Sequence, residues 1–329
     1  MKWCYVALWV AIAFWASVHG SYTTTARQQT PRADGARLLE VPASGSLQNP
    51  AWSPDGAALL LTRFVAGYNA EPADLLVFQR ESGTVRILFS DDNSNVNLPG
   101  PAWNAVTDEI VFSSTRGEHD EIYVIPADGN GTQQQITRRA DRMAYEPTWS
   151  PDGQRIVFEA HPLETEGHGV ITVTQRDGDG RYLALTPEDA DCRQPNWSPA
   201  GDWIVFQCLE AGRWDLWIVH PDGTERQRLT DGHGDKTDAS FSPDGRWIVY
   251  SGDAGTLEYA NLFIVPTAGG KPVRLTHFNG YDGAPAWSPD GRWVAFEAAP
   301  ADPDDANGTQ LWMISVPRRF GAVSDTREK

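Results

Sequence analysis

The chain has 329 residues, and its 44 acidic residues outnumber its 27 basic ones, which gives a formal net charge of −17. A negative field of this size repels nucleic acid and anionic membrane surfaces, so we expect neither as a partner. A chain of this length is also too long for one simple hydrophobic core, which favours an architecture that distributes its burial among repeats.

The N-terminus differs from the rest of the chain in composition. A basic start is followed by an apolar run from Trp3 to Ala16 and a small-residue exit near Gly20, the pattern of a secretory signal peptide. Retention as a membrane anchor is the alternative, although such anchors usually need about 20 apolar residues. We therefore expect export to the periplasm or outside the cell, membrane contact only through residues 1–20, and a polar, unstructured lead-in over 21–35.

A pentapeptide, Trp-Ser-Pro-Asp-Gly, recurs along the rest of the chain. Three copies are intact, two are close variants and one is worn, and neighbouring copies are 44 to 51 residues apart. A repeat of about 40 to 50 residues with four strands per unit is typical of a β-propeller. The first residue of each copy, which we call the anchor, is interpreted as core between blades rather than as part of a ligand cage. The six anchors are Trp52, Trp103, Trp149, Trp197, Phe241 and Trp287.

Each repeat contains the same succession of short strands. The approach to the anchor is followed by a Pro-Asp-Gly turn, a second strand such as Ile156–Phe158 and a third such as Leu216–Val219. A turn with glycine then leads to a fourth strand that ends in Leu-Thr, as at Leu229-Thr230. These period-two runs predict an all-β, six-bladed β-propeller of four-stranded antiparallel blades over residues 36–316, followed by a tail over 317–329.

The two ends of the repeat region predict how the ring closes. The sixth repeat stops after its third strand, Leu311–Ile314, and has no fourth. A strand-like segment, Ala36–Val41, precedes the first anchor and lacks a repeat of its own. Because unpaired blade edges are aggregation hazards, we expect this N-terminal strand to complete the last blade.

Two of the three cysteines flank the fourth anchor. Cys192 and Cys208 lie at equal distances from Ala200, the centre of the hairpin, and equal displacement places residues opposite one another on one face. In an oxidising compartment this geometry predicts a disulfide bond. Two buried free thiols are the alternative, and a local staple of this kind is structural in either case.

Catalytic motifs are absent from the sequence. It has no G-x-S-x-G nucleophile elbow, no HExxH helix and no Gly-rich phosphate loop, so we assign no catalytic residue. Asp231, His233 and Asp235, on the loop that enters the fifth repeat, are candidate ligands for Ca²⁺ or another divalent cation. Their spacing matches no known calcium loop, and a solvated acidic loop is the alternative. We expect no other cofactor.

The residues just before each anchor predict a binding site. Approach strands are innermost in a propeller, so these residues face the central opening, where convergent polar groups are the default binding hypothesis. A water-filled, functionally silent tunnel is the alternative, and an error of one residue in strand register would turn the side chains away. The candidates are Asn49, Glu146, Gln194 and Asp238, three positions before their anchors, and Tyr145 and Arg193, one position earlier.

The repeated Trp-Ser-Pro-Asp-Gly, with its Ile-Val-Phe strand and Leu-Thr ending, resembles the propeller domain of the TolB family. Similar repeats occur in the propellers of prolyl oligopeptidase-type peptidases. The resemblance covers residues 36–316. It implies an exported, non-catalytic scaffold that binds a protein or peptide partner, and we expect a monomer.

The sequence departs from both groups outside the propeller. TolB proteins carry an additional N-terminal α/β domain, for which the segment before residue 36 leaves no room, so we do not expect the Tol–Pal envelope role to carry over directly. The peptidases carry a C-terminal hydrolase domain, whereas this chain ends about a dozen residues after its last predicted strand. Two alternatives stay open: a metal-assisted lyase or hydrolase that acts on a carbohydrate or peptide at the channel mouth, and a propeller that delivers substrate to a separate hydrolase.

Overall fold

The computed structural model describes residues 32–70, 72–90, 96–97, 102–163, 168–300 and 308–320. The chain divides into two units, residues 1–30 and 31–329, and all the described residues belong to the second. The predicted signal peptide and most of the predicted lead-in lie outside the described residues. Within the described part there is no helix, and so none that is long and apolar enough to cross a membrane.

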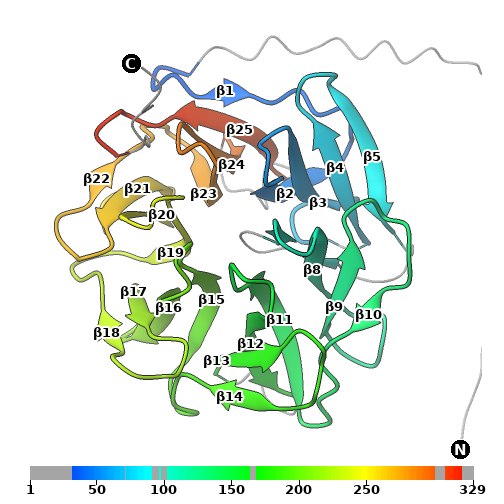
Figure 1. The fold of residues 1–329 in the computed structure, drawn as a ribbon. Coiled ribbons are helices and arrows are strands. Elements are labelled where there is room, and N and C mark those ends of the chain that lie inside the picture. The colour runs from blue at the N-terminus through cyan, green and yellow to red at the C-terminus, as the bar shows by residue number, and fades with distance from the viewer. Residues whose placement is uncertain are drawn as a thin grey trace, which may run out of the picture. The chain divides into compact units, whose positions relative to one another are not determined.

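The second unit is a six-bladed β-propeller (Figure 1). Each blade is an antiparallel sheet in which the first strand is innermost and the fourth is at the outer edge. Blade one has β2 (Ser46–Trp52), β3 (Ala58–Phe64), β4 (Ala73–Gln79) and β5 (Thr84–Phe89). Blade two has β6 (Val96–Asn97), β7 (Trp103–Asn104), β8 (Glu109–Ser114), β9 (Glu121–Pro126) and β10 (Gln134–Gln135), and both β6 and β7 pair with β8.

The other four blades follow the same order. Blade three has β11 (Arg142–Trp149), β12 (Arg155–Pro162), β13 (Val170–Gln175) and β14 (Tyr182–Ala184). Blade four has β15 (Cys192–Trp197), β16 (Ile204–Glu210), β17 (Arg213–Val219) and β18 (Gln227–Arg228). Blade five has β19 (Lys236–Phe241), β20 (Trp247–Gly252), β21 (Asn261–Pro266) and β22 (Val273–Arg274). Blade six has β23 (Tyr281–Trp287), β24 (Trp293–Ala299), β25 (Gln310–Ser315) and β1 (Arg37–Leu38).

The N-terminal strand closes the ring, as the sequence predicts. β1 pairs antiparallel with β25, with Arg37 opposite Met313 and Leu38 opposite Trp312. In Figure 1 the blue β1 lies along the red β25, so segments from the two ends of the propeller share one sheet. Blade six therefore has its four strands, and its outer edge is covered.

The described structure begins further toward the N-terminus than the sequence predicts. Arg32 and Asp34 fall in the predicted lead-in, yet both side chains are buried, with 4% and 2% of their surface exposed. The Arg32 guanidinium donates to both carboxylate oxygens of Asp282 in β23, at 2.7 and 2.8 Å. It also lies 4.0 Å from the ring centroid of Phe278. The prediction of an unstructured lead-in is therefore wrong for its last residues, because a buried ion pair holds them on blade six.

The anchor turns explain why the pentapeptide recurs. In blade one the Ser53 hydroxyl donates to Asp55 at 2.6 Å and accepts the N–H of Ala58 at 2.8 Å. The turn glycines have φ between 69° and 75°, in the left-handed region that L residues disfavour. Blade four has Ala200 in place of the pentapeptide Asp, and there Ser198 donates to Asp202, two residues after position 200, at 2.7 Å. Each Ser-Asp pair thus ties the turn to the start of the second strand.

The anchor turns of neighbouring blades also pack against one another. A Cβ added to Gly291 would lie 3.3 Å from Pro243 of the preceding blade, and one added to Gly56 would lie 3.8 Å from Pro289. The second contact joins blade six to blade one, so the series runs around the closure. Anchor side chains fill the spaces between blades: five of them, Trp52, Trp149, Trp197, Phe241 and Trp287, are 4 to 7% exposed. These five have the core role that the sequence predicts.

Blade four contains a disulfide bond. Cys192 of β15 and Cys208 of β16 are direct register partners, with Cα atoms 4.1 Å apart, and their sulfur atoms are bonded. Both residues are buried. The bond therefore fixes the innermost strand of blade four to the second strand next to Arg193 and Gln194.

Candidate functional site

The innermost strands share a backbone irregularity three residues before the anchor. In blades one and three to six, the register between the first and second strands shifts at this point, which is a β-bulge. The residue there has a positive φ in all five blades, between 44° and 54°. These five residues are Asn49, Glu146, Gln194, Asp238 and Ala284.

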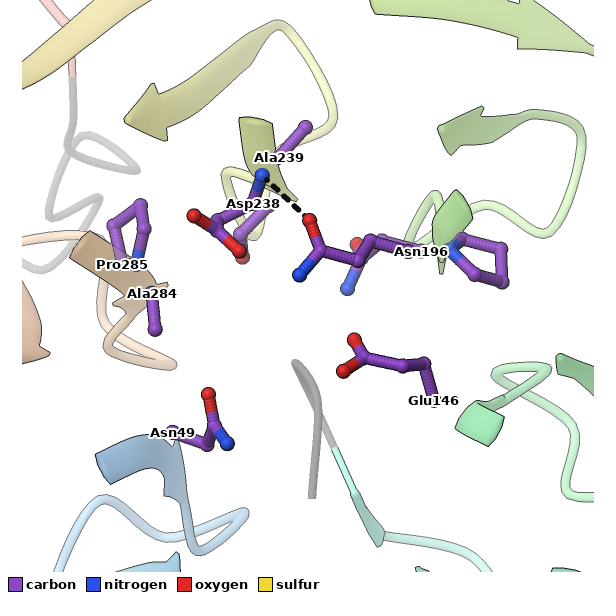
Figure 2. A pocket seen from close by; sticks show the side chains of 10 residues that line it. Asn49, Glu146, Asn196, Asp238, Ala239, Ala284 and Pro285 are labelled. Atoms are coloured by element: carbon purple, nitrogen blue, oxygen red, sulfur yellow. Dashed lines mark hydrogen bonds between the residues drawn. The ribbon is translucent and has the colours of Figure 1, made fainter. Parts of the chain in front are cut away.

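The bulge brings four of the predicted site residues together. Asn49, Glu146, Gln194 and Asp238, with Ala284, line one small pocket of about 30 Å³, which is room for about one or two water molecules. Figure 2 shows the side chains of Asn49, Glu146 and Asp238 directed toward a shared space. These groups come from four different blades, so only closure of the ring assembles them. We call this cavity the polar pocket.

The other two predicted residues, Tyr145 and Arg193, do not line the polar pocket. Arg193 forms an ion pair with Asp191 at 2.9 Å, and the Tyr145 ring makes an edge contact with His161, with centroids 5.4 Å apart. Each of these residues directly precedes a bulge residue, and successive residues of a strand point to opposite faces, so a different direction is expected for them.

Glu159, Gln207 and Glu297, on the second strands, support the bulges and were missed by the sequence-based reasoning. Each accepts the bulge N–H of the next blade. The Glu297 carboxylate accepts from Asn49 at 3.1 Å, and Gln207 accepts from Asp238 at 3.1 Å. Glu159 accepts from Gln194 at 2.8 Å. A signal was present in the sequence, since the apolar second strands break at Phe-Glu or Phe-Gln in these three blades.

The carboxyl groups in and beside the polar pocket have no direct ion-pair partner among the described residues, although the Arg193 charge acts on Glu146 through space. In the described part of the chain, no Lys, Arg or His nitrogen forms an ion pair with Glu146, Asp238 or Glu297. Burial raises the pKa of Glu146 well above its ordinary value, and the nearby Glu159 and Asp238 add to this. Burial likewise raises the pKa of Asp238, and it raises that of Glu297 to about 8. The pocket is therefore rich in oxygen atoms, and burial there disfavours the charged form of its carboxyl groups.

Two tyrosines connect Glu297 to the joint between blades six and one. The Tyr281 hydroxyl donates to the Glu297 carboxylate at 3.1 Å, and Tyr68, on the loop between β3 and β4, approaches the same oxygen at 3.4 Å. The two rings meet edge to face, with centroids 6.3 Å apart. Glu297 is thus hydrogen-bonded from both blades that meet at the closure of the ring.

A larger cavity adjoins the polar pocket on the face that carries the anchor turns. It has a volume of about 330 Å³ and is lined by residues of the anchor segments of all six blades. Its wall includes the anchors themselves and Pro54, Pro151, Pro199, Pro243 and Pro289. The two cavities share Asn196 and Ser240. We call the larger one the anchor-face cavity.

The candidate metal ligands do not form a metal site. Among the described residues, no group of three or more His, Cys, Asp and Glu side chains is placed to hold a metal ion. Asp235 instead accepts the backbone N–H of Trp214 at 2.9 Å. Asp231 and His233 are exposed on the same loop, as expected for a solvated acidic loop.

Known proteins resemble this chain in sequence and in fold. The chain is 28% identical over 220 residues to an uncharacterized protein of Agrobacterium fabrum, and the matched region covers 64% of this chain and 67% of that protein. It is 30% identical over 146 residues to a TolB homolog of Chlorobium luteolum, which covers 43% of this chain but only 30% of that protein.

Solved structures share the fold at low identity. A putative TolB of Agrobacterium tumefaciens has a TM-score of 0.59 at 18% identity, over 84% of this chain and 92% of that one. An oligogalacturonate lyase of Vibrio parahaemolyticus has a TM-score of 0.55 at 13% identity, over 87% and 94% of the two chains. The family model of the TolB β-propeller domain matches residues 11–207 and 131–298, which together are most of the sequence. The chain therefore belongs to the TolB β-propeller domain family.

Proposed function

We propose that this protein is an exported, non-catalytic scaffold that binds a segment of a protein or peptide partner in its central opening. The observation that carries the proposal is the polar pocket, where Asn49, Glu146, Gln194 and Asp238 converge from four blades. The backbone repeats at this position while the side chains differ. A structural role alone would favour the same residue in each blade, so the differences favour recognition of a particular ligand.

The surroundings of the pocket support a macromolecular ligand. The anchor-face cavity is about ten times larger than the polar pocket and opens on an apolar wall of tryptophan and proline. Aromatic and proline-lined hollows with a few convergent polar groups are typical binding sites. The N-terminal signal pattern supports export to the periplasm or beyond, and the net charge of −17 supports a partner other than nucleic acid.

A metal-assisted lyase or hydrolase is the alternative function. It is supported by the fold that the chain shares with an oligogalacturonate lyase. The polar pocket supplies carboxyl and amide groups but, within the described residues, no set of three or more metal-ligating side chains. Partner binding therefore agrees better with the residues that are present.

Affinity capture tests the proposal. The tagged chain without residues 1–20 is incubated with envelope and secreted fractions, and retained proteins are identified by mass spectrometry. We expect a partner that the wild type retains and that the double variant Glu146→Ala/Asp238→Ala retains at least tenfold less. Asp231→Ala, which removes an exposed acidic residue outside the pocket, is the matched control and should retain the partner fully.

Two results would contradict the proposal. One is a partner that all three proteins retain equally, since its binding would not involve the central opening. The other is an absence of any retained partner, together with a stoichiometric metal and turnover of a carbohydrate or peptide by the same preparation. The second result would establish the enzyme alternative.

A further inference from the structure

Because Asn196 and Ser240 line both cavities, we infer that the two together make one path with an apolar section and a polar end. The anchor-face cavity begins at the prolines and anchor side chains, and it meets the polar pocket at Asn196 and Ser240, which line both. Beyond these two residues lie Glu146 and Asp238. A group that enters from the anchor face therefore passes apolar walls before it reaches the carboxyl groups.

The polar end is suited to a small cation. Its volume of about 30 Å³ admits a group the size of one or two water molecules. Side chains of Asn49, Glu146, Gln194 and Asp238 surround this space. Each carries at least one acceptor oxygen. A primary ammonium has the size of a water molecule and three donors, whereas a guanidinium is larger and planar.

The apolar section is suited to an alkyl stem. Long basic side chains bury their methylene groups along apolar surface while the charged head reaches polar groups. Tryptophan and proline side chains supply that surface in the anchor-face cavity. A chain with the charge of −17 also attracts basic segments of a partner.

We propose that the path receives a lysine side chain of the partner segment, with its stem in the anchor-face cavity and its ammonium in the polar pocket between Glu146 and Asp238. This inference rests on the proposed function and names the chemistry of the group that is recognised. The ammonium supplies a direct ion-pair partner, which neither carboxyl group has among the described residues, since Arg193 acts on Glu146 only through space.

Binding of the ammonium is coupled to pH. Burial raises the pKa of both carboxyl groups, and an ammonium placed between them favours their ionised form and so lowers their pKa. Binding should therefore release protons, and affinity should rise as the pH rises. The ionisable groups that act on Glu146 are Glu159 of β12, Arg193 of β15, Asp238 of β19 and Glu297 of β24.

The probe is Nα-acetyl-lysine amide, compared with the norleucine and arginine analogues. Norleucine has the same stem without the ammonium, and arginine carries the larger head. By calorimetry at pH 7 we expect the lysine probe to bind at least tenfold more tightly than either analogue. Glu146→Gln and Asp238→Asn should each weaken the lysine probe by at least tenfold, whereas Asp231→Asn should leave it unchanged.

Position 284 provides a second test within the protein itself. Ala284 lines the polar pocket and has the same backbone conformation as Glu146 and Asp238. Ala284→Lys places an ammonium of the chain's own in the pocket, and it should abolish binding of the lysine probe and raise Tm. Ala284→Gln, which matches the residue at position 194, is the control and should not raise Tm.

Other outcomes overturn the inference without touching the proposed function. If the norleucine probe binds as tightly as the lysine probe, the site recognises only the alkyl stem. If the arginine probe binds more tightly than the lysine probe, the pocket accepts a guanidinium in preference to an ammonium. Lysine-probe binding that survives both Glu146→Gln and Asp238→Asn would place the ammonium elsewhere. If partner capture still depends on the pocket in those cases, the proposed function stands and only the lysine inference fails.

Discussion

Replacing Arg32 with alanine tests whether the segment before β1 is part of the fold. The Arg32 guanidinium makes a two-pronged ion pair with Asp282, and the exposed fractions of the two side chains are 4% and 0%. It also donates to Asp34, whose carboxylate accepts the backbone N–H of His277 at 3.0 Å. Loss of the guanidinium leaves the Asp282 carboxyl group buried without its cation.

The size of the effect follows from this burial. Removing one partner of a buried ion pair destabilises a protein by about 3 to 5 kcal/mol, because the remaining charge is uncompensated. Loss of the ring contact with Phe278, 4.0 Å from the guanidinium, adds to this cost. For a unit of this size a loss of that magnitude lowers Tm by on the order of 10 °C.

Urea denaturation of three variants provides the measurement. Arg32→Ala should lower the free energy of unfolding by about 3 to 5 kcal/mol, and Arg37→Ala, at an exposed position five residues later, should change it by less than about 0.5 kcal/mol. Replacing both partners, as Arg32→Met with Asp282→Leu, should recover part of the loss, since position 282 then carries no unpaired charge, whereas the Asp34 carboxylate still loses its bonds to Arg32. A loss below about 1 kcal/mol for Arg32→Ala would refute the reasoning and make the segment a loosely attached extension.

Three further predictions concern single elements of the propeller. Glu297 has a raised pKa of about 8, so its stabilising effect is complete below about pH 4.5 and is lost as the pH rises toward 8. The free energy of unfolding, measured with urea between pH 5 and 9, should therefore fall less steeply for Glu297→Gln than for the wild type, by up to about 1.4 kcal/mol per pH unit. An unchanged slope would contradict this. Replacing Cys192 and Cys208 together by serine opens a 16-residue loop and should cost about 3 kcal/mol in the same assay, a value that the reduced wild type should match. Asp202→Ala should lower the free energy of unfolding by about 1 kcal/mol, as much as Asp152→Ala, because each carboxylate accepts a hydrogen bond from the serine that follows the anchor, at 2.6 to 2.7 Å. An Asp202→Ala variant as stable as the wild type would show that this bond does not stabilise blade four.

The sequence predicts the fold well because the repeat carries its own turn chemistry. Gly153, for example, needs a left-handed backbone conformation, and Pro151 presets the turn before it. Such local requirements can be counted along a sequence without any knowledge of the ring. The missing fourth strand of the last repeat is equally visible, so the closure by β1 could be predicted as well.

Contacts between distant segments are much harder to predict. Arg32 lies in a stretch of small and polar residues, and nothing local distinguishes it from the exposed Arg37. Its partner, Asp282, is 250 residues away. Asp202 was overlooked for the opposite reason: the pentapeptide directs attention to position 200, where alanine stands, while the backbone allows an aspartate two residues later to accept the same bond.

The polar pocket lies between these two cases. Position relative to the anchor identified Asn49, Glu146, Gln194 and Asp238, because the repeat places them at equivalent points of the ring. The neighbouring Tyr145 and Arg193 were included because they stand one position earlier, but successive residues of a strand point to opposite faces, so they do not line the pocket. A bulge can be detected from sequence only where it shifts an alternation of polar and apolar residues. Where the residues on both faces of a strand are polar, there is no such alternation to shift.

The bulge also bears on why the pocket residues differ from one another. A positive φ suits Gly or Asn, and other residues adopt it at a cost of about 1 to 3 kcal/mol. If the bulges served the fold alone, asparagine, which stands at position 49, would be expected at the equivalent position of every blade. Glu146 and Gln194 have φ of 51° and 53° instead, and Glu146 is also partly buried near other carboxyl groups. Glu146 thus combines a strained backbone with a carboxyl group whose charged form is disfavoured. A bound cation would offset the cost of placing that charge in the pocket, but it would not relieve the backbone strain.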